Sequence, residues 1–99
     1  SNRVIRQGFY AKALEIEVLS PDNSKSEMAK KRLEYFESGC RLYWEINPRT
    51  RTVVVFTSRD SQRIYSESEF LDGGEVLPGF TLSLSELFAA YDEGLETLP

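Results

Sequence analysis

The fold is decided by residues 14–35, which read LEIEVLSPDNSKSEMAKKRLEY and predict a strand, a turn and a helix in succession. Residues 13–19 alternate between side chains of two kinds, which is typical of a β-strand whose two faces meet different surroundings. One face is apolar and consists of Leu14, Ile16 and Val18. The other face carries Glu15 and Glu17, so two carboxylates point the same way.

A helix is expected after the turn at residues 20–23, where Pro21 cannot donate to a neighbouring strand. Ser24 and Glu27 have the spacing of a capping box, and Gly39 suits the position just past a helix end. The face predicted to meet the core is an apolar stripe at spacings of four, three and four, formed by Ala29, Leu33, Phe36 and Cys40. Lys31 lies off this stripe, on the flank that it shares with Met28 and Tyr35.

Composition predicts one small folded domain over residues 1–99. Forty per cent of the residues are apolar and 12% are aromatic, and no apolar run approaches the ~20 residues of a membrane span, so no membrane association is expected. Residues 1–3 carry no structural signal and are typical of a cloning remnant. No secretory leader is visible and the single Cys40 cannot form an internal disulfide, so a reducing cytoplasm is the expected compartment.

Sixteen acids against twelve bases give a net charge of −4, the wrong sign for holding nucleic acid by bulk electrostatics. Any DNA contact must therefore be local. The basic residues do cluster, on the predicted helix and around the hairpins that follow: Lys25, Lys30, Lys31 and Arg32, then Arg49, Arg51, Arg59 and Arg63. A solvated helix face with charged loop tips is the simpler interpretation, and a phosphate-binding surface is the alternative.

The middle of the chain predicts a mixed sheet. Residues 41–46 alternate like a strand, and their connection to 14–19 through a helix predicts a parallel, right-handed crossover. The turn at 47–50 and the β-branched run that follows predict an antiparallel hairpin over 41–57. Residues 62–66 extend this hairpin into a meander.

The ends of the chain are expected to contribute less to the core. Residues 4–10 predict a short strand or arm, and short strands are expected at 69–71 and 75–77, bounded by glycine and proline. Residues 84–91 predict a second helix capped by Ser83 and Glu86, with a core face of Leu84, Leu87, Phe88 and Tyr91. The acidic tail, 92–99, is expected to fray. The fold class is therefore mixed α/β (α+β), with a C-terminal helix.

Most catalytic signatures are excluded, because the chain has no histidine, one cysteine and no glycine-rich phosphate loop at a helix start. What remains is Glu15, Glu17 and Lys31. Carboxylates two apart on one strand face lie roughly 6–7 Å apart at the backbone, so both can reach one Mg²⁺, and a nearby ammonium can serve a water or a phosphate. This set suits phosphodiester hydrolysis. The simpler interpretation is the solvated outer face of a half-covered sheet.

Four separated blocks carry a family resemblance. They are EVLSP at 17–21, KRLEY at 31–35 with Gly39 four residues later, YWEINP at 43–48, and LPGF at 77–80 before LSELF at 84–88. In this order they resemble the C-terminal half of the Uma-type putative restriction endonuclease family, within the PD-(D/E)XK nuclease superfamily. The resemblance implies a restriction-endonuclease-like core in a bacterial protein, and a Mg²⁺-dependent endonuclease that acts on DNA.

Carried over residue by residue, Glu17 matches the family's strand glutamate and Lys31 its helix lysine. The family usually has Pro-Asp four residues before that glutamate, where this chain has Lys12 and Ala13. Alanine cannot bind metal, so Glu15, on the same strand face, is the expected substitute ligand beside Glu17. The family also has an upstream helix and hairpin that carry another metal-binding aspartate. The chain is therefore expected to be a fragment or a truncated member.

Three functions stay open at this point. The first is a metal-dependent phosphodiesterase with Glu15, Glu17 and Lys31 as its site. The second is a non-catalytic structural domain that associates with itself, because a sheet edge beside residues 14–19 without its upstream hairpin seeks a partner, which predicts a homodimer. The third is a DNA-binding module without cleavage. Tyr43 and Trp44 face opposite ways on their strand, so they are expected to be core and cover rather than one base-stacking platform.

Overall fold

A computed structural model describes residues 13–97 of the chain, so the arm expected at 4–10 and the cloning remnant expected at 1–3 lie outside the described residues. The elements follow in the order β1 (Leu14–Val18), α1 (Lys25–Glu37), β2 (Leu42–Asn47), β3 (Thr52–Ser58), β4 (Ser61–Ser66), β5 (Phe70–Gly73), β6 (Leu77–Ser83) and α2 (Leu84–Thr97). Within residues 13–97, neither helix is long and apolar enough to cross a membrane.

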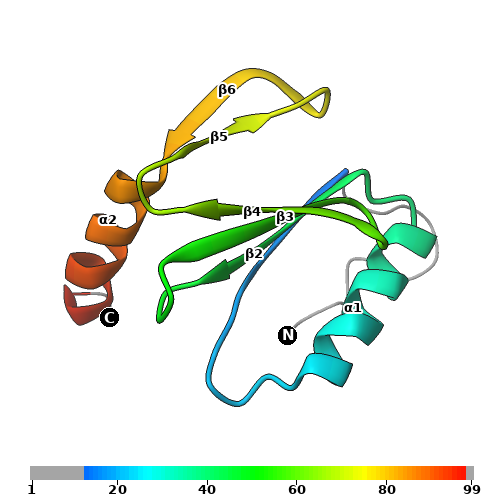
Figure 1. Cartoon of the computed structure of the whole chain (residues 1–99), viewed down its shortest axis with the longest axis horizontal. Helices are drawn as coiled ribbons and strands as arrows, with labels where there is room; N and C mark the ends of the chain where they lie inside the picture. The colour runs from blue at the N-terminus through cyan, green and yellow to red at the C-terminus, as the bar shows by residue number, and fades with distance from the viewer. Residues whose placement is uncertain (1–12, 98–99) are drawn as a thin grey trace.

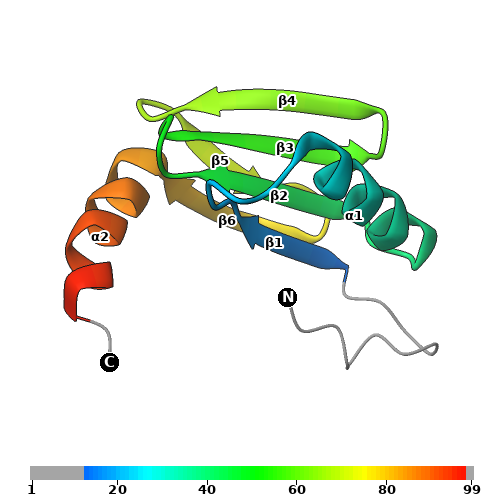
Figure 2. The same cartoon turned by 90° about the horizontal axis from the view of Figure 1, so that it is seen from below.

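The first four strands form one mixed sheet in the order β1-β2-β3-β4 (Figure 1). Strands β1 and β2 run parallel and are joined through α1, whereas β2–β3 and β3–β4 are antiparallel hairpins. The predicted strand-helix-strand connection and the meander are both confirmed. Figure 1 shows α1 on one side of the four strands and β5 and β6 on the other, and Figure 2 shows the four strands side by side with α1 in front of them.

The sheet therefore has a core on each face. On one side, Leu42, Trp44, Ile46 and Val53 pack against Leu71 of β5 and against Leu84 and Phe88 of α2. On the other side, Tyr43 and Phe56 pack against Tyr35 of α1 and against Cys40. Neighbouring residues of β2 thus serve opposite cores, which confirms that Tyr43 and Trp44 do not form one platform.

Both predicted ends of α1 are confirmed. The Ser24 side chain accepts a hydrogen bond from the Glu27 backbone N–H, and the Glu27 carboxylate accepts one from the Ser24 N–H, so the capping box is complete. Gly39 has a φ of 103°, a left-handed conformation in which any other residue would be strained. The Cys40 N–H then bonds back to the Tyr35 carbonyl, which directs the chain into β2.

The face that α1 presents to the sheet differs from most of the predicted stripe, of which only Cys40, just past the helix, is buried. Met28 and Tyr35 are its buried residues, at 5% and 3% exposed, while Ala29 is exposed and Leu33 and Phe36 are only half-buried. The helix is rotated toward the flank that holds Lys31. The physical reason is that the sheet beneath α1 carries carboxylates, which need cationic and hydroxyl partners from the helix.

The C-terminal elements differ from expectation in two places. Strand β6 runs through Pro78 and Gly79 instead of ending at residue 77, because a register shift between Asp72 and Gly73 leaves residues 78–80 opposite no residue of β5. A proline needs no partner there. Helix α2 continues to Thr97 instead of fraying from residue 92, and Arg51 holds it by an ion pair of 3.0 Å to Asp92. The predicted core residues Leu84 and Phe88 are fully buried.

The observed rotation of α1 predicts different costs for two truncations on its surface. Met28→Ala should lower the free energy of unfolding by about 2–5 kcal/mol, because it opens a cavity under the helix. Leu33→Ala, on the half-buried stripe, should cost clearly less. Urea denaturation of both variants measures the difference, and a larger loss for Leu33→Ala would mean that the stripe faces the core after all.

Candidate functional site

The face of the sheet under α1 brings two carboxylates side by side. Glu17 of β1 and Glu45 of β2 are directly opposite in the parallel register, so their side chains leave the sheet on the same side. Both are shielded from solvent, with side chains 16% and 7% exposed. A carboxylate that loses this much hydration needs charged or hydrogen-bonding partners nearby.

Helix α1 supplies those partners to Glu17. The Lys31 ammonium lies 3.6 Å from one carboxylate oxygen, and the Tyr35 hydroxyl donates a hydrogen bond to the other. Lys31 and Tyr35 are four residues apart, so one turn of the helix presents both to the same strand. The structure thus brings together Glu17 and Lys31, two of the residues that the sequence singled out.

Glu15 lies on the same face but in a different setting. It is half-buried and opposite Tyr43 in the register, one strand repeat from Glu17. In the part of the chain that the structure describes, no three His, Cys, Asp or Glu side chains come close enough to hold a metal ion together. Ala13 is half-buried, and its carbonyl accepts hydrogen bonds from the backbone N–H groups of Arg41 and Leu42. Its methyl group supplies no ligand.

Glu45 is the site residue that sequence reasoning missed. Its carboxylate accepts a 2.7 Å hydrogen bond from the Arg32 guanidinium, which also lies 4.8 Å from the centre of the Phe56 ring. Glu45 lies in residues 41–46, for which sequence reasoning considered only the apolar face of the strand. A signal was present, because an acid inside a strand that is paired on both sides is buried and calls for a cation from the covering helix.

Tyr43 lies between the acids and carries an unusual hydroxyl. The oxygen is buried and has no hydrogen-bond partner of ordinary geometry among residues 13–97. Burial raises the pKa of this phenol well above its usual range, followed by the negative charge of the Glu45 carboxylate, its proximity as a hydrogen-bond acceptor, and the negative charge of Glu17. The Tyr43 phenol is therefore neutral at pH 7.

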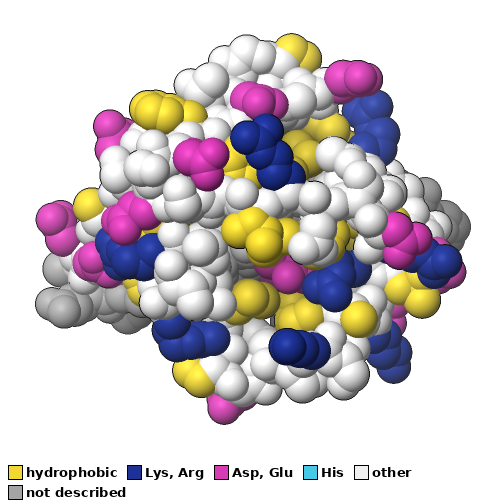
Figure 3. Space-filling view, viewed as in Figure 1, with side chains coloured by type: hydrophobic (Ala, Val, Ile, Leu, Met, Phe, Trp, Pro, Cys, Tyr) yellow, Lys and Arg dark blue, Asp and Glu magenta, His cyan; other side chains and the backbone are white. Residues whose placement is uncertain are grey.

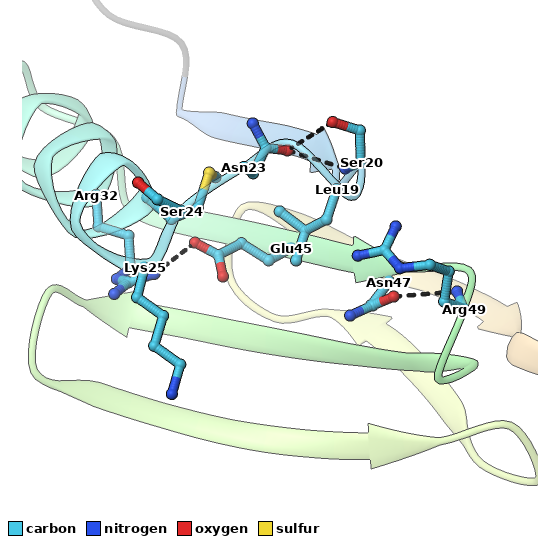
Figure 4. A pocket seen from close by; sticks show the side chains of 10 residues that line it. Leu19, Ser20, Asn23, Ser24, Lys25, Arg32, Glu45, Asn47 and Arg49 are labelled. Atoms are coloured by element: carbon cyan, nitrogen blue, oxygen red, sulfur yellow. Dashed lines mark hydrogen bonds and ion pairs between the residues drawn. The ribbon is translucent and has the colours of Figure 1, made fainter.

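A pocket of about 350 Å³ opens beside these residues, at the carboxyl ends of β1 and β2 (Figure 4). Arg32 and Glu45 border it from the helix and from the sheet, and the start of α1 and the β2–β3 turn complete it. Its remaining lining residues are Leu19, Ser20, Asn23, Ser24, Lys25, Met28, Asn47 and Arg49.

The basic residues that cluster in the sequence are divided by the fold. Lys25, Arg32 and Arg49 all line the pocket. Three others lie elsewhere in ion pairs: Arg51 with Glu67 and Asp92, Arg59 with Asp60, and Arg63 with Glu69. Basic and acidic side chains are interspersed over the face drawn in Figure 3, so the positive charge at the pocket is local.

Residues 13–85 match the model of the Uma2 family, which is described as "Putative restriction endonuclease". The chain belongs to this family. The match covers both Glu17 and Lys31, and it also includes Glu15 and Glu45. No curated protein matches the chain.

A solved structure shows the same fold. It is a putative nuclease belonging to DUF820 from Anabaena variabilis, 26% identical to this chain with a TM-score of 0.71. The alignment covers 82% of this chain and 46% of the other, so the chain spans less than half of that protein's length. The mixed sheet, its crossover helix and the second hairpin are therefore those of a restriction-endonuclease-like nuclease fold, as expected.

The two tyrosines of the site predict different effects of removing a hydroxyl. Tyr35→Phe should destabilise the protein by about 1.5–3 kcal/mol, because the Glu17 carboxylate loses a hydrogen bond. Tyr43→Phe should cost clearly less at pH 7, because its buried hydroxyl has no hydrogen bond of ordinary geometry to lose. Above pH ~10 the wild type should lose stability, since the unfolded chain ionises a phenol that stays neutral when folded. Urea midpoints across pH decide this: a Tyr43→Phe variant that keeps the full alkaline loss contradicts the assignment.

Proposed function

We propose that this chain carries the catalytic face of a metal-dependent endonuclease that hydrolyses phosphodiester bonds of DNA. Glu17 and Glu15 are the proposed metal ligands, and Lys31 is the cation that faces the attacking water or the phosphate. The observation that carries the proposal is the contact of 3.6 Å between Lys31 and Glu17, which the crossover helix creates in a chain of the restriction endonuclease family.

The donor set fits Mg²⁺, because this ion takes oxygen ligands and is commonly held by one or two carboxylates together with waters and substrate phosphates. Bound there, it would polarise a phosphoryl oxygen and acidify a coordinated water. Glu15 offers the second carboxylate that Ala13 does not. Glu45 is more deeply buried than Glu17 and forms a closer ion pair, at 2.7 Å with Arg32, so it is not assigned as a ligand.

The chain's own residues prepare this chemistry in two ways. The Tyr35 hydroxyl donates a hydrogen bond to one oxygen of Glu17. The helix, rather than solvent, therefore fixes the orientation of the Glu17 carboxylate. Lys31 lies at the other oxygen with 16% of its side chain exposed, so its ammonium is held at the edge of the site and can turn toward a phosphate oxygen. Tyr43 and Phe56 are buried on the same face of the sheet.

Calorimetry and plasmid nicking test the proposal together. The wild type should bind Mg²⁺ or Mn²⁺, Glu17→Gln should abolish both binding and nicking, and Lys31→Ala should abolish nicking while metal still binds. Glu15→Gln should weaken metal binding if Glu15 replaces the missing aspartate. Glu75→Gln, an exposed acid on the β5–β6 loop, is the matched control. Nicking by Glu17→Gln at the wild-type rate would refute the site.

A non-catalytic domain that associates with itself is the second candidate. Strand β1 is an edge strand of the described sheet, and Ile16 and Val18 on its face away from α1 are 48% and 52% exposed. Ala13 in place of the family's aspartate supports the same proposal. A homodimer that packs these strands together would cover the apolar residues.

Light scattering after gel filtration tests the dimer. The wild type should elute at twice its 11.3 kDa, and Val18→Lys should convert it to a monomer, because a charge cannot be buried in that interface. Ile64→Lys, on exposed β4 at the other edge, should leave the dimer intact. A wild-type monomer at tens of micromolar would exclude this second candidate.

A further inference from the structure

The pocket at the carboxyl ends of β1 and β2 is not used by the proposed cleavage site, yet it adjoins that site directly. Glu45 in its wall is the register neighbour of Glu17, and Arg32 follows Lys31 in α1. A strand of nucleic acid that crossed Glu17 and Lys31 would therefore continue over this pocket. Its volume of about 350 Å³ lies in the range of pockets that hold small ligands.

The charge of the pocket opposes that of the whole chain. Three cationic side chains, those of Lys25, Arg32 and Arg49, line it beside a single carboxylate, that of Glu45. The chain as a whole carries a net charge of −4, so this positive surplus is a local feature. A local surplus of this sign is what an anionic ligand requires on an acidic protein.

Arg32 is held in place before any ligand arrives. One of its N–H groups binds Glu45 at 2.7 Å, and its guanidinium lies over the Phe56 ring. A guanidinium has five N–H donors in a rigid fork that matches phosphate oxygens, so donors remain for a ligand after the bond to Glu45 is made. Little side-chain entropy remains to be lost when these donors bind.

The neutral lining also offers donors. The Asn47 side-chain oxygen accepts from the backbone N–H groups of Arg49 and Thr50, which fixes its amide nitrogen as the outward donor. The first turn of α1 adds less, because the Ser24 side chain already satisfies the Glu27 N–H. The cations and the Asn47 amide, rather than the helix end, are what would recognise an anion.

We propose that this pocket binds a backbone phosphate of the DNA strand whose scissile bond lies at Glu17 and Lys31. Arg32 is the fixed donor, and Lys25 and Arg49 are flanking cations from the start of α1 and from the β2–β3 turn. This assignment rests on the proposed nuclease function and deepens it, since it states where the substrate strand runs next to the cleavage site.

Fluorescence anisotropy with a labelled DNA duplex, measured in EDTA across a range of salt concentrations, tests the assignment. The double variant Lys25→Gln/Arg49→Gln should bind more weakly and should lower the slope of log K against log salt by about 1 for each side chain. The matched double variant Lys30→Gln/Arg59→Gln removes the same charge from exposed positions outside the pocket and should keep the wild-type slope.

Glu45→Gln is the more decisive variant, because it should change the DNA affinity in the opposite direction. Its amide oxygen can still accept from Arg32, but the carboxylate charge is gone from the pocket, so DNA should bind more tightly than to the wild type. Weaker binding by a Glu45→Gln variant that remains folded would overturn the assignment. Circular dichroism of each variant establishes that the fold is kept.

The remaining outcomes separate this inference from the proposed function. If the wild type and both double variants bind DNA equally tightly and with the same salt dependence, the pocket does not bind the phosphate. The nuclease proposal is then unaffected. A wild type that binds no duplex, with or without Mg²⁺, overturns both. If inorganic phosphate shifts the backbone amide resonances of Asn47 and Ser24 while DNA does not bind, the pocket is a free-phosphate site and the strand assignment is wrong.

Discussion

Two carboxylates, Glu17 and Glu45, leave the sheet side by side beneath helix α1, and their loss of hydration has to be compensated. The compensation comes from one turn of the helix, in which Lys31 and Tyr35 meet Glu17 while Arg32 meets Glu45. Removing one partner of such a pair leaves a buried charge without compensation, which costs far more free energy than losing an exposed salt bridge. The rotation of α1, the depth of Tyr43 and the shape of the neighbouring pocket all depend on these contacts.

The same contacts connect stability with chemistry. An ammonium that neutralises Glu17 in the folded chain is also the group that a phosphodiesterase would place at its phosphate, and a carboxylate fixed by a tyrosine is already oriented. The helix thus pairs Glu17 with a cation, Lys31, and pairs the neighbouring acid, Glu45, with Arg32.

Much of this fold could be predicted from sequence, because its signals are local. The capping box at Ser24, the left-handed glycine at position 39 and the alternation in 14–18 each specify an element without reference to the rest of the chain. The mixed order of the first four strands follows from the length and type of their connections. Glu17 and Lys31 were singled out from the sequence because other catalytic signatures were excluded, although the alternation of the strand alone favoured a solvated face, and the family resemblance then implied their roles.

Two of the errors share one cause, which is that apolar patterning predicts only the burial of apolar side chains. The stripe through Ala29 and Leu33 is the most apolar face of α1, yet the helix buries the flank whose polar groups have partners on the sheet. Glu45 escaped notice for the same reason. Strand β6 was misplaced because Pro78 and Gly79 are turn residues in most settings, and nothing local reveals that they fall in a bulge of a two-stranded sheet.

A double-mutant cycle between Glu17→Gln and Lys31→Met tests most directly whether the helix delivers its cation to the strand carboxylate. The free energies of unfolding should show a coupling of about 0.5–3 kcal/mol, as expected for two groups in contact. The parallel cycle with Lys30→Met, one residue away on the exposed face of α1, should show none. A Glu17–Lys31 coupling indistinguishable from the Lys30 control would contradict the account.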